Sequence, residues 1–132
     1  MTAVDAARDP PGYRLAFDED TRIVRQTLIG FWDVALLHAF AAEATPMFAR
    51  IARDGRPFSI LSDARRFPVQ SKEVGAAFNA IVAASPLRPR RIATLVGDTL
   101  SKVQSERLFP FRSMRAFLRE DEALAWLAAD DG

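Results

Sequence analysis

The spacing of the apolar residues changes along the chain, and each spacing predicts a different element. Residues 13–17 alternate apolar with polar or small side chains, the period of two that gives a strand one apolar face. A polar turn at residues 18–21 separates them from a second β-rich run at residues 23–29, which ends at Gly30. The two runs together predict a β-hairpin.

From Asp33 the apolar residues recur every three or four positions, which is the stripe of an amphipathic helix. The stripe consists of Leu36, Phe40, Ala44, Met47, Phe48 and Ile51. Pro46 removes one backbone donor from this segment, but the stripe stays in phase across it. We therefore predict one kinked helix, rather than a restart at Thr45, ending near Gly55, where glycine suits a left-handed cap.

The rest of the chain alternates short strand-like runs with helical stripes. Buried strands are predicted at residues 58–61 and 92–96, and an edge strand at residues 111–118. The helical stripes are Val74, Ala77, Phe78 and Ile81 with Ser71 as N-cap, then Leu100, Val103 and Leu108 after an N-cap at Asp98, and finally Ala123, Leu124, Trp126 and Leu127. Strands that alternate with helices imply right-handed crossovers and a largely parallel sheet.

These elements predict an α/β fold in the order β-β-α-β-α-β-α-β-α. The sheet has five strands, mostly parallel, with one antiparallel strand contributed by the opening hairpin, and it carries about four helices. We expect a single domain over residues 13–129, between an N-terminal tail at residues 1–12 and a C-terminal tail at residues 130–132.

Residue composition excludes several kinds of chemistry. The 132-residue chain has no cysteine and one histidine, so disulfides, zinc clusters and thiol nucleophiles lack their usual ligands. No stretch approaches the roughly 18 apolar residues of a membrane span, and the first ten residues lack the apolar core of a secretory signal. We therefore expect no metal site, no transmembrane segment and a cytoplasmic location.

Charge is distributed unevenly although the net charge is only +1. Residues 88–119 contain eight Arg or Lys against Asp98 and Glu106, whereas residues 120–131 contain five acids. We favour internal complementarity between adjacent elements as the reason; attraction of an acidic partner is the alternative. Nucleic-acid binding is not expected, because a pI near 8.3 is modest and no aromatic residues interleave the arginines.

Asp63 is the strongest candidate for a functional carboxylate. It follows the strand predicted at residues 58–61, and ligands of open α/β sheets bind beyond the carboxyl ends of the strands. Arg65 and Arg66 lie beside it in the loop predicted at residues 63–68. An acid with two guanidinium groups holds such a loop together, the interpretation we favour, or binds an anionic ligand. The basic run 88–91 enters the next strand from its opposite end, so one pocket should not contain both groups.

No motif in the chain supports catalysis. The sequence has no Gly-x-Ser-x-Gly elbow, Walker loop or dinucleotide fingerprint, and hence no cofactor is expected. His38 lies off the apolar stripe of its helix, which indicates an exposed side chain. We expect a protein that is not an enzyme. Action of Asp63 and its arginines on an anionic substrate remains as the enzymatic alternative.

Three stretches of the chain carry a family resemblance: Gly30-Phe31-Trp32, Ser59-Ile60-Leu61-Ser62-Asp63, and Asp121-Glu122-Ala123-Leu124-Ala125-Trp126-Leu127. They resemble the SpoIIAA-like (STAS/SEC14-type) family of bacterial proteins. The resemblance covers residues 13–129 and implies a SpoIIAA/STAS-like fold. Antagonists of this type carry a phosphorylatable serine in an Asp-Ser-Ser-Gly run. The nearest stretch here keeps only Ser71, without the preceding Asp or the following Gly, so a plain N-cap is favoured over a phosphoswitch.

The resemblance implies two functions. The first is a protein-interaction or regulatory module, which docks an unknown partner or a second copy of itself through residues 63–71 and the helix that follows. The second is a SEC14-like carrier of a lipid or another small apolar or anionic ligand. Ten phenylalanines, including Phe40, Phe48 and Phe78, agree with the carrier, although an aromatic core accounts for them as well.

Overall fold

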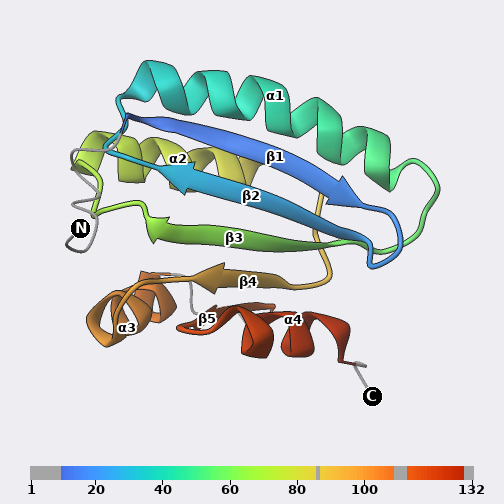
Figure 1. The fold of residues 1–132 in the computed structure, drawn as a ribbon. Helices are drawn as coiled ribbons and strands as arrows, with labels where there is room; N and C mark the ends of the chain where they lie inside the picture. The colour runs from blue at the N-terminus through green and yellow to red at the C-terminus, as the bar shows by residue number, and fades with distance from the viewer. Residues whose placement is uncertain (1–9, 86, 109–112, 130–132) are drawn as a thin grey trace.

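The helices and strands follow one another along the chain in the predicted order. The structure, a computed structural model, describes residues 10–85, 87–108 and 113–129 (Figure 1). Its elements are β1 (Gly12–Asp18), β2 (Ile23–Ile29), α1 (Val34–Ala52), β3 (Ser59–Arg66), α2 (Lys72–Ala84), β4 (Ile92–Leu95), α3 (Thr99–Leu108), β5 (Met114–Phe117) and α4 (Glu120–Ala128). The strands lie in the order β1-β2-β3-β4-β5, and β1 alone is antiparallel to its neighbour. The α/β fold with a mostly parallel sheet is therefore confirmed.

The ends of the chain and of two elements fall outside the described residues. Except for residues 10–12, the predicted tails at 1–12 and 130–132 are not described, and Gly12 already belongs to β1. The first residues of the edge strand predicted at 111–118 are likewise outside the description. Its described part, β5, does lie at the edge of the sheet.

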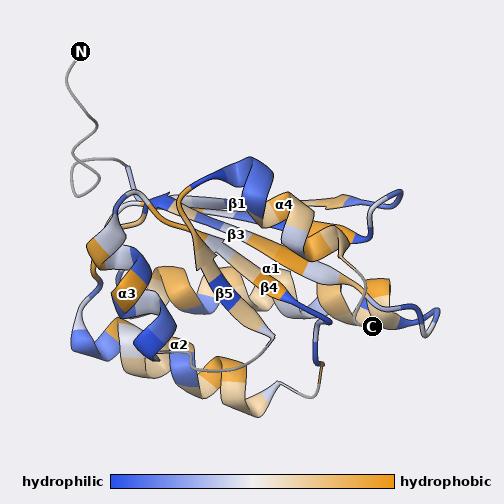
Figure 2. Ribbon diagram, turned by 90° about the horizontal axis from the view of Figure 1, so that it is seen from below, coloured by the Kyte–Doolittle hydropathy of each residue, from blue (hydrophilic) through white to orange (hydrophobic). Residues whose placement is uncertain are grey.

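Alternation of side chains along the central strands divides the core between two faces. Val24 of β2 and Ile60 of β3 are register partners and pack with Ile51 of α1 on one face. Leu61 of β3 points to the other face, where it joins a cluster that includes Ala93, Leu95, Ala123 and Leu127. Helices α1 and α2 thus cover one face and α4 the other (Figures 1 and 2).

Helix α1 runs without interruption through Pro46, so the prediction of one helix is confirmed. Asp33 caps it by accepting a hydrogen bond from the backbone N–H of Leu36 at 2.8 Å. Gly55 follows it with a φ of 73°, the left-handed conformation expected there. The observed apolar stripe differs from the predicted one at one residue: in the first turn the fully buried leucine is Leu37, and Leu36 is only half-buried.

Strand β3 is longer than predicted. The prediction of a loop at residues 63–68 is wrong for residues 63–66, which belong to the strand. The strand continues to Arg66 because β2 offers pairing partners along its full length: Thr27 pairs with Asp63, and Ile29 with Arg66. Buried backbone groups require such partners whatever the polarity of the side chains. Asp63 therefore lies within a central strand instead of beyond its end.

The prediction that α3 buries an apolar side is also wrong. Leu100 is 66% exposed and Val103 is 42% exposed, and the side chain of Leu108 is not described. Helix α3 contacts mainly the edge strand β5, and Figure 2 shows hydrophilic residues along much of its length. The predicted N-cap of this helix is confirmed, since Asp98 Oδ1 accepts from the backbone N–H of Ser101 at 2.7 Å.

We predict that Leu95→Ala lowers the free energy of unfolding by about 2–5 kcal/mol, because the Leu95 side chain is completely buried and its removal leaves a cavity. Leu100→Ala is the matched control, and we expect it to change stability by less than about 0.5 kcal/mol. Urea unfolding followed by circular dichroism measures both. If Leu100→Ala lowered the free energy of unfolding as much as Leu95→Ala, the Leu100 side of α3 would have to be packed against another part of the molecule.

Candidate functional site

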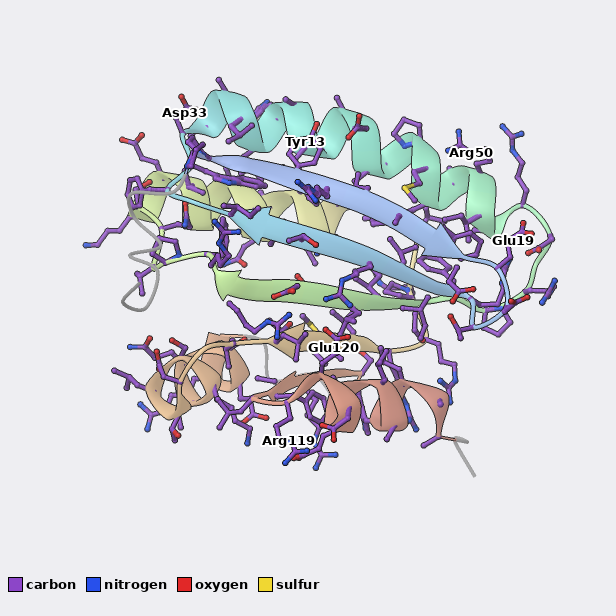
Figure 3. All side chains as sticks on the ribbon, viewed as in Figure 1. Tyr13, Glu19, Asp33, Arg50, Arg119 and Glu120 are labelled. Carbon is purple, nitrogen blue, oxygen red and sulfur yellow. The ribbon has the colours of Figure 1, made fainter. Side chains whose placement is uncertain are left out.

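Asp63 is the centre of an ion-pair network on the α4 face of the sheet. Its Oδ2 accepts from Nη2 of Arg65 at 2.7 Å and from Nη2 of Arg25 at 3.2 Å, and its Oδ1 accepts from Nε of Arg65 at 2.9 Å. Glu120, which projects from the start of α4 toward the sheet (Figure 3), binds Arg25 Nη2 at 2.8 Å and Arg65 Nη2 at 3.5 Å. Two acids and two guanidinium groups thus neutralise one another.

The pKa values of this network follow from its geometry. Burial alone would raise the pKa of Asp63, but hydrogen bonds from the Arg65 side chain and backbone, with the charges of Arg65 and Arg25, lower it below its usual value. The hydrogen bond from Arg25 is the main cause that lowers the pKa of Glu120. Both carboxylates are therefore ionised near neutral pH and engaged with arginines, an arrangement that leaves little charge to attract an anion.

The other residues singled out from the sequence lie apart from this network. Arg66 is the last residue of β3, and its carbonyl accepts from the N–H of Gly30 at 2.9 Å. Ser71 caps α2, because its Oγ accepts from the N–H of Val74 at 3.2 Å. The basic run lies at the opposite end of β3, as predicted, where Arg90 and Arg91 donate to backbone carbonyls in the last turn of α4, among them that of Leu127.

A glutamine that the sequence reasoning did not single out ties two loops together. Gln70 accepts from the N–H of Trp32 at 2.8 Å and donates to the carbonyls of Gly30 and Pro68. The indole of Trp32 is 2% exposed and packs against the ring of Phe67, with centroids 5.2 Å apart. The Gly30-Phe31-Trp32 stretch therefore anchors the link from β2 to α1 beside the link from β3 to α2.

A large apolar groove lies on the opposite face of the sheet. It has a volume of about 980 Å³ and lies between α2 and α3, over β3 and β4. Its apolar walls include Phe40, Phe48, Phe58, Ile60, Phe78 and Val82. Helix α2 meets the groove with a stripe of residues at helical spacing, Gly75, Asn79 and Val82. This volume is at the upper end of the roughly 300–1,000 Å³ typical of small-molecule sites.

Three polar residues form a row on the floor of the groove. Gln26, Ser62 and Thr94 are direct register partners in β2, β3 and β4, and all three line the groove. Gln26 Nε2 donates to Ser62 Oγ at 3.0 Å, and these two side chains are buried. The sequence contained a signal for this row, because each residue is the polar member between two apolar inward positions of its strand. Sequence reasoning missed it, since the strands had not been aligned.

Other kinds of site have less support. Among residues 10–85, 87–108 and 113–129, no three His, Cys, Asp or Glu side chains gather as a metal site would require. Within the same residues, no helix has both the length and the apolar character needed to cross a membrane. His38 lies on the exposed side of α1, as its position off the stripe predicted.

We predict that Asp63→Asn lowers the free energy of unfolding at pH 7 by about 1–3 kcal/mol, because it leaves two arginines with one acid. The Asp63 pKa is lowered in the folded state, so its contribution is complete above its unfolded pKa of about 3.9 and is lost as pH falls through the folded pKa. The deficit of the variant should therefore shrink below about pH 4 in urea titrations. Asp121→Asn, in an exposed pair with Arg119, is the control and should cost much less than Asp63→Asn, because solvent screens an exposed ion pair. A deficit that stayed constant to about pH 2 would contradict this account.

Comparison with known proteins identifies the fold. No protein-family model matches the sequence, and no curated protein matches it. Among solved structures, the chain is similar to an uncharacterized protein from the DUF3478 family, with a SpoIIAA-like fold, from Shewanella loihica PV-4. The TM-score is 0.68 at 13% identity, over 96% of this chain and 98% of that one. The resemblance read from the sequence is confirmed at the level of the fold: this protein has a SpoIIAA-like fold.

Proposed function

We propose that this protein binds a small apolar ligand in the groove between α2 and α3, without catalysing a reaction, and acts as a carrier or sensor of that ligand. The observation that supports the proposal is the groove itself, about 980 Å³ in volume, with phenylalanine walls and a short polar row on its floor. A few convergent polar groups in an otherwise apolar hollow are the usual composition of a ligand site. This is the carrier function that the sequence resemblance offered as its second alternative.

Energetics favour a ligand with an extended apolar part. Each buried CH₂ group contributes about 0.8 kcal/mol, so a chain of ten gives roughly 8 kcal/mol, enough to offset a substantial part of the cost of association. The row of Gln26, Ser62 and Thr94 supplies hydrogen-bonding groups that can orient a polar atom of the ligand. Apolar burial thus supplies affinity, and the polar row supplies orientation.

The placement of the ionised groups supports binding without chemistry. Asp63 is on the other face of the sheet from the groove and is engaged by Arg25 and Arg65. The described lining of the groove includes neither a carboxylate nor the histidine, so it lacks the groups that most often transfer protons at neutral pH. The enzymatic alternative centred on Asp63 is accordingly not part of this proposal.

We predict that Gly75→Leu weakens the binding of an apolar probe at least tenfold. Gly75 lines the groove, and a Cβ added there meets no atom within 4 Å, so a leucine would project into the ligand volume without a backbone clash. The substitution should also stabilise α2 slightly, by about 0.5–1 kcal/mol, because glycine is unfavourable inside a helix. Fluorescence titration with N-phenyl-1-naphthylamine measures the affinity.

Ala76→Leu is the matched control, because Ala76 is the exposed neighbour of Gly75 in α2 and does not line the groove. It should leave probe binding unchanged. If the wild-type protein bound no probe, or if both leucine variants bound it as tightly as the wild type, the groove would not be a ligand site.

We also propose, as a second candidate, a protein-interaction surface at the ends of β2 and β3. Phe31 is 49% exposed and Val69 is 78% exposed, on the two links that Gln70 ties together. Exposed apolar side chains that gather on neighbouring loops are typical of contact surfaces. Val69 lies within residues 63–71, the segment through which the sequence resemblance expected an unknown partner or a second copy to dock.

We predict that a photo-crosslinking amino acid at position 69 or 31 gives the same discrete crosslinked species in the native cell. The same amino acid at position 38, on the exposed side of α1, should give none and is the control. Mass spectrometry of the crosslinked species distinguishes a second copy of this chain from a different protein. Identical species from all three positions, or none from position 69, would exclude this surface as a specific interface.

A further inference from the structure

The charged residues of the apolar groove are all of one sign. Its described lining includes Arg88, from the segment between α2 and β4, and Arg107, from the last turn of α3, but no aspartate or glutamate. We infer that the ligand is a single-chain anionic amphiphile, whose carboxylate or phosphate binds to Arg88 and Arg107 while its chain lies along Phe40, Phe48 and Phe78. This inference rests on the proposed ligand-binding function and names the chemical class of the ligand.

Several described arginines pair with a carboxylate, but Arg107, like some other exposed arginines, does not. Arg22 binds Asp54, Arg25 and Arg65 share Asp63 and Glu120, and Arg119 binds Asp121. The side chain of Arg107 makes no hydrogen bond or ion pair within residues 10–85, 87–108 and 113–129. A guanidinium group beside an apolar surface, without an acid in the same lining, is available to an external anion.

Arg88 also has no carboxylate partner among these described residues. Its Nη1 donates to the backbone carbonyls of Ser85 and Leu87, which hold the side chain at the end of α2 without neutralising it. Since guanidinium groups present several donors in one plane, they suit carboxylate and phosphate oxygens. Two such groups beside a surface of low polarity favour an anion over a neutral ligand of the same shape.

A purely structural explanation accounts for only part of these observations. A basic residue in the last turn of α3 complements the helix dipole, which explains a positive charge at position 107. It does not explain why a described lining of this size, drawn from seven elements and their links, includes two arginines and no acid. The volume of about 980 Å³ suits one chain with one headgroup better than a two-chain lipid.

The test compares C16 amphiphiles that share a chain and differ in headgroup, titrated into the full chain below their critical micelle concentrations. The probes are hexadecanoate, hexadecyl phosphate, hexadecanol and hexadecyltrimethylammonium, and each is measured by displacement of N-phenyl-1-naphthylamine. We expect at least one of the two anions to bind tenfold or more tightly than hexadecanol, and the ammonium compound to bind most weakly. The stronger of the two anions identifies the headgroup as a carboxylate or a phosphate.

The variants Arg107→Gln and Arg88→Gln should each weaken the binding of the preferred anion three- to tenfold and leave the affinity for hexadecanol unchanged. Arg50→Gln is the control, because Arg50 is exposed in the last turn of α1 and does not line the groove. Equal affinity for anions and hexadecanol, or no response to either groove variant, would overturn the inference while leaving the ligand-binding function intact. If none of the four amphiphiles displaced the probe, or if no probe bound at all, the proposed function itself would fail.

Discussion

The register in which β3 pairs with β2 and β4 decides on which face of the sheet each polar side chain lies. Ser62 and Asp63 are consecutive residues, so their side chains project to opposite faces. Pairing with Gln26 and Thr94 places Ser62 in a row on the groove floor. Pairing with Thr27 places Asp63 on the α4 face, diagonally across from Arg25, which precedes Thr27 by two residues in β2. A shift of one residue would exchange the two faces. The ion-pair network and the groove are thus two results of one register.

The two faces are covered to different extents, and this difference creates the groove. On the α4 face, Ala123 and Leu127 are buried against Leu61, Ala93 and Leu95. On the other face, α1 buries four residues, whereas α2 buries Val74 alone, and α3 turns serines and glutamine toward the hollow. A polar α3 lacks the apolar surface that would draw it onto α2. The core on that face, which includes Phe40 and Phe58, consequently borders an open groove on its α3 side.

Local signals carried most of the correct predictions. Ser71 and Asp98, both predicted as N-caps, each accept a hydrogen bond from a backbone N–H three residues away, so sequence neighbours suffice to recognise them. Failures concern contacts between distant residues. The partners of Asp63 include Arg25, which in turn binds Glu120 at a separation of 95 residues, and no local pattern contains that information. The groove likewise depends on how far apart α2 and α3 lie, which no local pattern contains. Its polar row is recognised only after three strands are aligned.

Contact between Arg25 and Glu120 also sets an order of events during synthesis on the ribosome. Chains emerge from the N-terminus, and β1 to β4 with α1 and α2 are complete long before residues 120–128 are made. Until then, Leu61, Ala93 and Leu95 lack the cover of α4, and Arg25 lacks one of its two acids. The partly synthesised protein therefore presents an apolar surface until α4 docks, and exposed surfaces of this kind are what make folding intermediates prone to aggregation.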